Sequence, residues 1–247
     1  MKFLYRGALY EEDYHRGPTS HFNLKFISQI HDIATNVGLF AFKYVRSPKY
    51  QPDAILPVSK NPNIYLRITD NTHFVDADAE LSNYEDGYLI TIAERHVKSR
   101  DISNDVFISI LHEVTHILQR ENGIYSDLSH NHTNGLNPNA YFNDPTEVNA
   151  FLMSIIAFIT FSPSRAKLMT KMPFDVFVNH VISYLKTTKK DFVEYMAHGK
   201  KSESKYDEGD NTYDSTRSKF YEILHLLHAK LKQGYFSELP TMSGGVS

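Results

Sequence analysis

Cysteine is absent from this sequence of 247 residues. Its absence excludes disulfides, thiolate metal ligands and a cysteine nucleophile, so any metal site has to be built from histidine and carboxylate side chains. Charge of one sign is not in large excess either, because the formal net charge is only −3. A nucleic-acid-binding domain needs a basic surface, and we therefore expect no nucleic-acid partner.

Long apolar runs are missing as well. The longest, residues 151–161, covers about eleven residues, whereas a helix needs roughly twenty to cross a bilayer. Residues 1–14 are too polar after a short apolar start to resemble a signal peptide. The sequence therefore predicts no membrane association and no signal peptide.

The content of the chain is otherwise that of a globular protein. Hydrophobic residues make up 41% and aromatic residues 13% of it, which suffices for a sizeable core. Alternating apolar and polar residues predict strands at residues 63–68, 74–81 and 88–93. Apolar spacings of three and four predict a helix over residues 22–42 that ends near Gly38. Between them, residues 44–63 contain four prolines and are predicted to form a loop.

Helical periodicity dominates the second half. The segments predicted to be helical are residues 103–123, 144–161, 164–172, 174–186, 189–198 and 215–233. The predicted fold class is α+β, with a small N-terminal antiparallel sheet packed on the helix at 103–123, followed by a mostly helical C-terminal half. We predict a single domain with a sheet-containing lobe (1–100) and a helical lobe (101–240). The polar stretch 199–211 and the tail 241–247 are predicted to be irregular.

The helix predicted over residues 103–123 contains His112-Glu113-Val114-Thr115-His116. Histidines four residues apart lie on one face of a helix, so both imidazoles can bind one metal ion. Glu113 is adjacent and could act as a general base toward a water molecule. This HExxH pattern is typical of zinc-dependent peptidases. The plainer alternative is a pair of surface histidines that share this spacing by coincidence.

A catalytic zinc site needs a third protein ligand and leaves a fourth position for water. Downstream candidates are His130, His132, Asp144, Glu147 and His180. Glu147 is best placed, because Asp144 and Pro145 resemble the N-cap and first residue of a helix that Glu147 would open. A glutamate at that position is also the usual capping-box partner, and spacing alone leaves ligand and cap as alternatives.

Two segments together resemble a known family. Residues 111–119 carry the HExxH pattern, and residues 141–151 carry Pro145, Glu147 and Ala150 as Pro-x-Glu-x-x-Ala. The combination is similar to the gluzincin-type metallopeptidases, and closest to small, mostly uncharacterised bacterial and phage-encoded proteins with these two helices. The resemblance covers residues 103–151 and implies a zincin-like fold. It departs from the thermolysin-like branch at Phe151, where that branch has an aspartate four residues after its ligand glutamate.

The resemblance implies that Zn²⁺ is held by His112, His116 and Glu147 and that Glu113 is the general base. The expected function is a zinc metallopeptidase that hydrolyses peptide bonds in a peptide or protein substrate. The rival hypothesis is a catalytically silent protein of the same fold, serving as a structural or binding component of a phage assembly. A cytoplasmic or virion-associated location fits either reading. Oligomeric state stays open.

Residues near the motif have roles that the sequence leaves open. Candidates for stabilising the oxyanion are Tyr125, His130, His132 and Tyr141. Arg120 could pair with a substrate carboxylate or be a solvated helix residue. By analogy with the family, residues 88–93 could be an edge strand that pairs with an extended substrate.

Two further clusters are better explained without a metal. The acidic residues Asp76, Asp78 and Glu80 lack the arrangement of a calcium loop and fit a solvated strand face. His225 and His228, three residues apart in the last predicted helix, have no third ligand at a useful spacing. We interpret them as partly buried core histidines.

Overall fold

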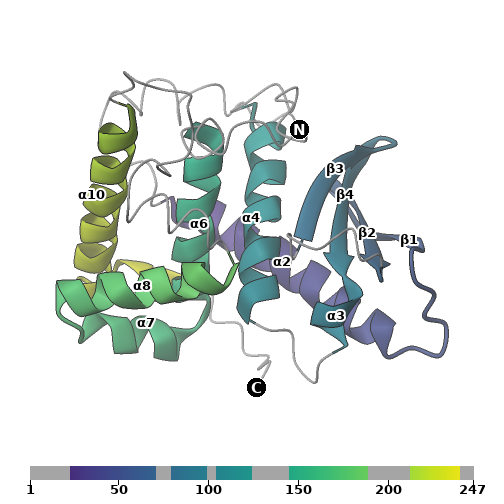
Figure 1. Cartoon of the computed structure of the whole chain (residues 1–247), viewed down its shortest axis with the longest axis horizontal. Coiled ribbons are helices and arrows are strands. Elements are labelled where there is room, and N and C mark those ends of the chain that lie inside the picture. The colour runs from purple at the N-terminus through teal and green to yellow at the C-terminus, as the bar shows by residue number, and fades with distance from the viewer. Residues whose placement is uncertain (1–22, 71–78, 99–103, 124–144, 189–211, 240–247) are drawn as a thin grey trace, which may run out of the picture.

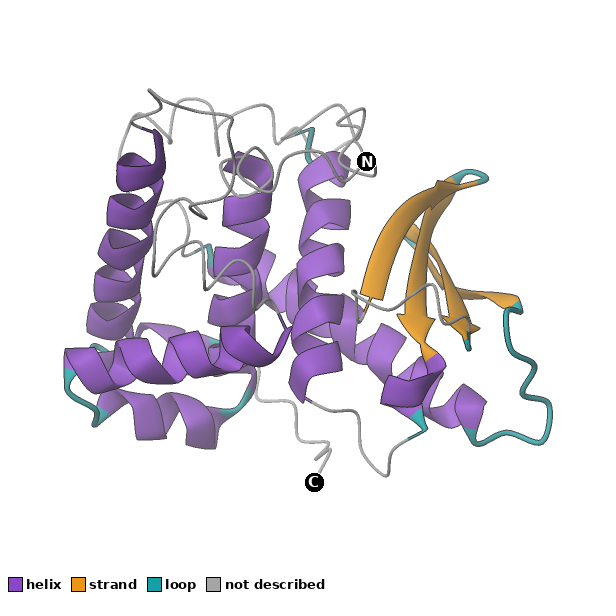
Figure 2. Ribbon diagram, viewed as in Figure 1, coloured by secondary structure: helices purple, strands orange, loops and turns teal. Residues whose placement is uncertain are grey.

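The computed structural model describes residues 23–70, 79–98, 104–123, 145–188 and 212–239. The strands gather at one end of the molecule and helices fill the rest (Figure 2). Along the chain, the sheet precedes the helix that contains the two motif histidines, and the described part of the second half is helical. The predicted α+β class is thus confirmed. The segments 124–144, 189–211 and 240–247 lie outside the described residues, as do the predictions made for them.

Four strands form one sheet in the order β1-β2-β4-β3. Their bounds are Ile55–Lys60 for β1, Asn63–Thr69 for β2, Ala79–Tyr84 for β3 and Gly87–Ala93 for β4. The two outer pairs are antiparallel and the central pair, β2 with β4, is parallel. The sheet is therefore mixed rather than antiparallel as predicted. The reason is topological: β3 occupies the far edge, and the β3–β4 hairpin returns β4 to the position beside β2.

The strand β1 was not predicted, because its proline suggested a loop. Pro57 lies within β1, and the pairing register with β2 shifts between Pro57 and Ser59. An edge strand tolerates proline and a bulge, since one side of its backbone needs no partner strand. The prediction of an edge strand at residues 88–93 was wrong, because β4 is an inner strand of the sheet. The edge strand that contacts the motif helix is β3.

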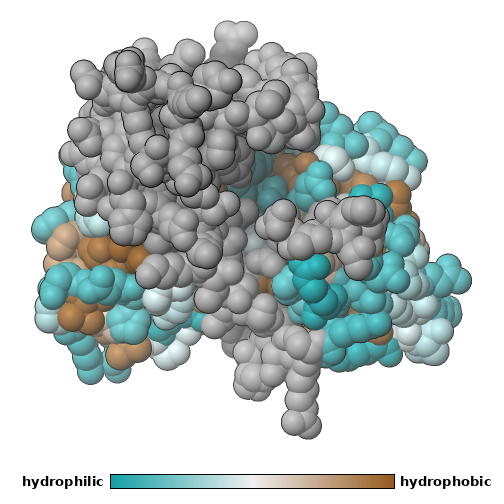
Figure 3. Space-filling view, viewed as in Figure 1, coloured by the Kyte–Doolittle hydropathy of each residue, from teal (hydrophilic) through white to brown (hydrophobic). Residues whose placement is uncertain are grey.

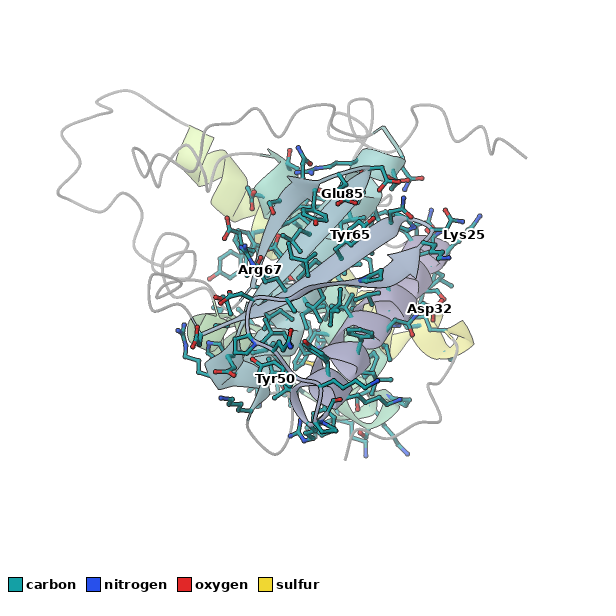
Figure 4. The ribbon with its side chains drawn as sticks, turned by 90° about the vertical axis from the view of Figure 1, so that its right-hand side faces the viewer. Lys25, Asp32, Tyr50, Tyr65, Arg67 and Glu85 are labelled. Carbon is teal, nitrogen blue, oxygen red and sulfur yellow. The ribbon has the colours of Figure 1, made fainter. Side chains whose placement is uncertain are left out.

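One face of the sheet is covered by helices. Ile64, Leu66 and Ile68 of β2 are buried in the same core cluster as Ile90 and Ile92 of β4, as expected for alternate residues along a strand. The intervening residues point the other way. Figure 4 looks onto that side, with Tyr65 and Arg67 on the sheet and α2 beside it.

Seven α-helices and a 3₁₀ helix are described. Their bounds are Leu24–Val45 for α2, Glu94–Val97 for α3, Asn104–Glu121 for α4, Pro145–Phe161 for α6, Pro163–Thr170 for α7, Phe174–Thr188 for α8, Thr212–Lys232 for α10 and Tyr235–Glu238 for the 3₁₀ helix η3. The N-cap of α2 is Asn23, whose side chain accepts hydrogen bonds from the backbone N–H groups of Lys25 and Phe26. Contrary to prediction, α2 continues past Gly38. Glycine costs a helix only about 1 kcal/mol, and Val37, Gly38 and Ala41 are all buried.

Helix α4 is the centre of the molecule (Figure 1). It contacts α2, α6 and α8 and, on the side of the sheet, β3 and β4. Its buried apolar residues include Val106, Ile110, Leu111, Val114 and Ile117. Because α4 is enclosed on several sides, the polar residues Glu113, Thr115 and Gln119 are buried in it along with the two motif histidines.

None of the described helices is long and apolar enough to cross a membrane on its own. The part of α6 from Asn149, taken together with α7, would be long and apolar enough, but the two helices are bent by 102°. Most of α6 is buried inside the protein. Exposed hydrophobic side chains gather instead at the end formed by α7 and α8, where Leu168 and Val176 are exposed (Figure 3).

Candidate metal centre

The two motif histidines lie side by side within α4. His112 is 1% and His116 7% exposed, so neither is a surface residue, and the coincidental surface pair is ruled out. Their rings are 4.7 Å apart at the centroids. The two Nε2 atoms approach to 3.1 Å. One turn of helix thus directs both nitrogens to one point.

Glu147 reaches the same point from α6. It lies in the first turn of that helix, and its Oε2 is 3.2 Å from Nε2 of His112 and 3.4 Å from Nε2 of His116. This carboxylate oxygen therefore faces the histidines across the α4–α6 contact. The geometry favours the ligand reading of Glu147 over the capping reading, which spacing alone had left open.

The spacing of the three donor atoms suits a metal ion. A tetrahedral ion with bonds of about 2.0–2.1 Å places its ligand atoms about 3.3 Å apart, and the three separations here are 3.1, 3.2 and 3.4 Å. Among the described residues, His112, His116 and Glu147 are the only group of three or more potential ligands close enough to share an ion. The group fits a site of the HExxH type.

The electrostatics of the group favour a cation at its centre. Burial alone would lower the pKa of His116, but the charge and hydrogen bond of Glu147, together with Glu113 and Gln119, raise this pKa above its ordinary value. Burial would likewise raise the pKa of Glu147. The charge of His116 and hydrogen bonds to both histidines instead hold it well below its usual range. A positive charge shared by these groups is thus stabilised despite burial.

A glutamine on α4 orients His116. Oε1 of Gln119 lies 3.0 Å from Nδ1 of His116, and since an amide oxygen only accepts, Nδ1 carries a proton. Nε2 is therefore the ring nitrogen that would give up its proton to bind a metal. Nε2 of Gln119 donates to Oδ1 of Asn149 on α6 at 3.4 Å. Gln119 is fully buried and Asn149 4% exposed. This arrangement holds the imidazole in the tautomer that a metal needs.

The first histidine has an apolar neighbour. The ring of Phe151, one turn after Glu147 on α6, lies 4.5 Å from the ring of His112 at the centroids. This chain thus places an apolar ring against His112 at the sequence position where the thermolysin-like pattern has an aspartate. Its contribution is to exclude water from this side of the imidazole and to restrict its rotation.

Glu113 lies next to the group without belonging to it. It is 8% exposed, and its charge acts on both His116 and Arg120. A buried carboxylate within electrostatic reach of the histidines is in a position to exchange a proton with a molecule bound there.

Comparisons with protein-family models, curated protein sequences and solved structures found no match. The likeness to an HExxH site therefore depends on the residues and geometry described here.

The other residues that the sequence suggested for the site either lie away from the metal group or fall outside the described residues. His180 is exposed on α8 and does not join the group, so this candidate ligand was wrong. The candidates outside the described residues are Tyr125, His130, His132, Tyr141 and Asp144. Of the acidic cluster, Glu80 is exposed on β3 as expected, and Asp76 and Asp78 lie outside the described residues.

The second histidine pair is divided between core and surface. His228 is 5% exposed, and its Nε2 donates to the carbonyl of Met172. Its ring stacks on Phe177 with the centroids 4.7 Å apart. His225 is exposed and lies against Phe174. The core interpretation is confirmed for His228 and wrong for His225.

Sequence reasoning missed the supporting residues Gln119 and Asn149. The signal for Gln119 was present, since it lies three residues after His116 and so on the same helix face. Asn149 offered none, because its part in the site depends on the packing of α6 against α4.

Proposed function

We propose that this protein is a zinc-dependent metallopeptidase. The observation that supports this best is the buried triangle of donor atoms from His112, His116 and Glu147 with Glu113 beside it. A structural site has no need of a base adjacent to its ligands. Within the described part of the chain three ligands converge, the number found in catalytic zinc sites that keep one position open.

The donor set fits zinc better than it fits calcium or magnesium. Two imidazole nitrogens with one carboxylate oxygen are a common ligand set of catalytic zinc, whereas calcium and magnesium prefer oxygen ligands throughout. When bound, Zn²⁺ would supply a Lewis acid that polarises a carbonyl and acidifies water.

The chain's own residues would perform the proton transfers. Glu113 would accept a proton from the attacking water at its carboxylate and deliver it to the nitrogen of the leaving amine. Gln119 would keep the lone pair of His116 directed at the ion. The sheet edge β3, which contacts α4, offers backbone groups with which an extended peptide could pair.

Metal analysis and hydrolysis assays on the same variants test this proposal. We expect about one zinc per chain in protein purified without added metal, and none in His112→Ala. Glu113→Gln should retain zinc and lose hydrolysis of a peptide library by at least about 100-fold, within the range that general-base catalysis contributes. Retained turnover in Glu113→Gln would remove its assignment as base. Zinc without turnover in the wild type would favour the silent structural or binding protein.

Glu147 is tested against its neighbour Asp144. If Glu147 is a ligand, Glu147→Ala should lower zinc occupancy far more than Asp144→Ala, since a lost cap affects only the helix start. Equal occupancy in both variants would return Glu147 to a capping role.

A further inference from the structure

Arg120 is fixed at the rim of the sheet, one turn beyond His116 on α4. Its Nη1 donates to Oδ1 of Asn83 at 3.0 Å, and its guanidinium carbon lies 5.6 Å from the centre of the Tyr88 ring. Asn83 and Tyr88 are directly opposite each other on β3 and β4. The Tyr88 hydroxyl donates in turn to Glu121 at 2.8 Å. Arg120 is thus held between the motif helix and the sheet edge.

In this position one nitrogen of the guanidinium makes no hydrogen bond to the described residues. Nη2 of Arg120 is buried and has no hydrogen-bond partner among the described residues. A buried donor without a hydrogen-bond partner destabilises the folded state, and more so when it is charged. A residue whose only purpose was to join α4 to β3 would gain nothing from that cost, whereas a residue that awaits a ligand would recover it on binding.

The charge of Arg120 acts on the proposed active site. It interacts with the carboxylates of Glu113 and Glu147, which places the guanidinium within electrostatic reach of both. A substrate carboxylate that lay beside Glu113 would be repelled by its charge, and the guanidinium of Arg120 would offset that repulsion. Arg120 is the cation available beside β3 and α4 within the described residues.

We propose that Arg120 binds a carboxylate of the substrate close to the scissile bond, and so selects peptides that carry one there. The inference rests on the proposed peptidase function. A guanidinium presents parallel N–H donors that match a carboxylate, and such charge-assisted bonds are stronger than neutral ones. The carboxylate can be a free C-terminus or an acidic side chain, which have the same chemistry.

The test uses peptide hydroxamates of one sequence that differ in a single group. One pair ends in a carboxylate or a carboxamide, and a second pair, amidated at its end, carries Glu or Gln beside the hydroxamate. Titration calorimetry on the zinc-loaded and the metal-free protein measures binding without turnover. We expect the wild type to prefer one carboxylate probe over its neutral partner by about 10–100-fold, the range that hydrogen bonds to a charged group support. The pair that shows the preference identifies the source of the carboxylate.

Arg120→Gln should abolish that preference and leave the neutral probe unaffected. Arg120→Lys keeps the positive charge but loses the parallel N–H donors, and it should retain part of the carboxylate preference. This variant replaces Arg120→Gln in the test if the glutamine variant does not fold. Arg46→Gln, at the end of α2, is the matched control and should behave as wild type. Equal binding of charged and neutral probes by the wild type, or an equal loss of both in the variants, would overturn the inference. Carboxylate preference without zinc binding or hydrolysis would overturn the proposed function and leave the role of Arg120 standing.

Discussion

Gln119 shows how a single side chain can prepare a metal ligand. It accepts the Nδ1–H of His116 and is itself held by Asn149 from the neighbouring helix. Because the amide is buried, no water can replace it without a cavity forming. The orientation of His116 therefore exists before any metal binds, and less free energy is lost in ordering the site.

Replacing Gln119 should weaken metal binding without unfolding the protein. For Gln119→Leu we expect zinc affinity to fall about 10–100-fold, the usual effect of losing a partner that orients a ligand. Gln119→Glu should retain most of the affinity because a carboxylate also accepts the Nδ1 proton. Competition with a chelating dye measures these affinities. The control is Asn122→Ala, which removes a hydrogen bond to the carbonyl of Leu118 and should bind zinc as the wild type does. A zinc affinity of Gln119→Leu equal to that of the wild type would show that the hydrogen bond from His116 to Gln119 does not orient the ligand.

At the scale of elements, α2 and α6 are tied together by a buried histidine. Nε2 of His31 donates to the carbonyl of Ala157 at 2.8 Å, and the ring meets Phe161 edge-on. Burial lowers the pKa of His31, although the bond to Ala157 and the charge of Asp32 oppose this. The tie helps to hold α6, the helix that carries Glu147, in place behind α4.

This tie should make stability depend on pH. Because the pKa of His31 is lowered by folding, the histidine takes up a proton more readily in the unfolded chain. Its contribution to the free energy of unfolding is therefore complete above the ordinary pKa of 6.5 and is lost as the pH falls below that value. His31→Gln should therefore lose less stability than the wild type between pH 7.5 and 5.5, while being about 1–2 kcal/mol less stable at pH 7.5. Urea unfolding at several pH values provides the comparison. The control is His180→Gln, at an exposed position, whose stability should change with pH as that of the wild type does. If the wild type and His31→Gln showed the same change of stability with pH, His31 would not contribute to the pH dependence.

At the scale of the whole molecule, the candidate metal centre joins two elements of one core. The histidines belong to α4, which also contacts the sheet, and Glu147 belongs to α6, which leads into the helical half. An ion bound between them would link α4 to α6 directly. Binding to the folded state alone also stabilises that state by mass action.

Removing the metal should accordingly lower the melting temperature. With zinc at about 100 times its dissociation constant the folded state gains about 2.7 kcal/mol, which corresponds to roughly 5–10 °C for a chain of this size. Differential scanning calorimetry before and after chelation measures the shift, and added zinc should restore it. His112→Ala should show neither effect. A wild-type melting temperature that chelation leaves unchanged would mean that no ion links the two helices.

The sequence by itself determined the features that depend on neighbours along the chain. The helices at 103–123 and 144–161 were located to within about two residues, since their apolar spacing and terminal residues are local signals. The same holds for strands β2 and β4 and for the convergence of His112 and His116, which four-residue spacing in a helix ensures. Local signals failed where packing outweighed them: α2 runs through Gly38, and β1 accommodates Pro57.

Only the tertiary structure decided the features that join distant segments. It brought Glu147 to the histidines, placed β4 between β2 and β3, and connected Gln119 to Asn149 and Arg120 to Asn83. Each of these depends on which faces of two elements meet. That choice is made by burial of the whole core, a sum over contacts between residues far apart in the chain, so no single stretch of sequence contains it.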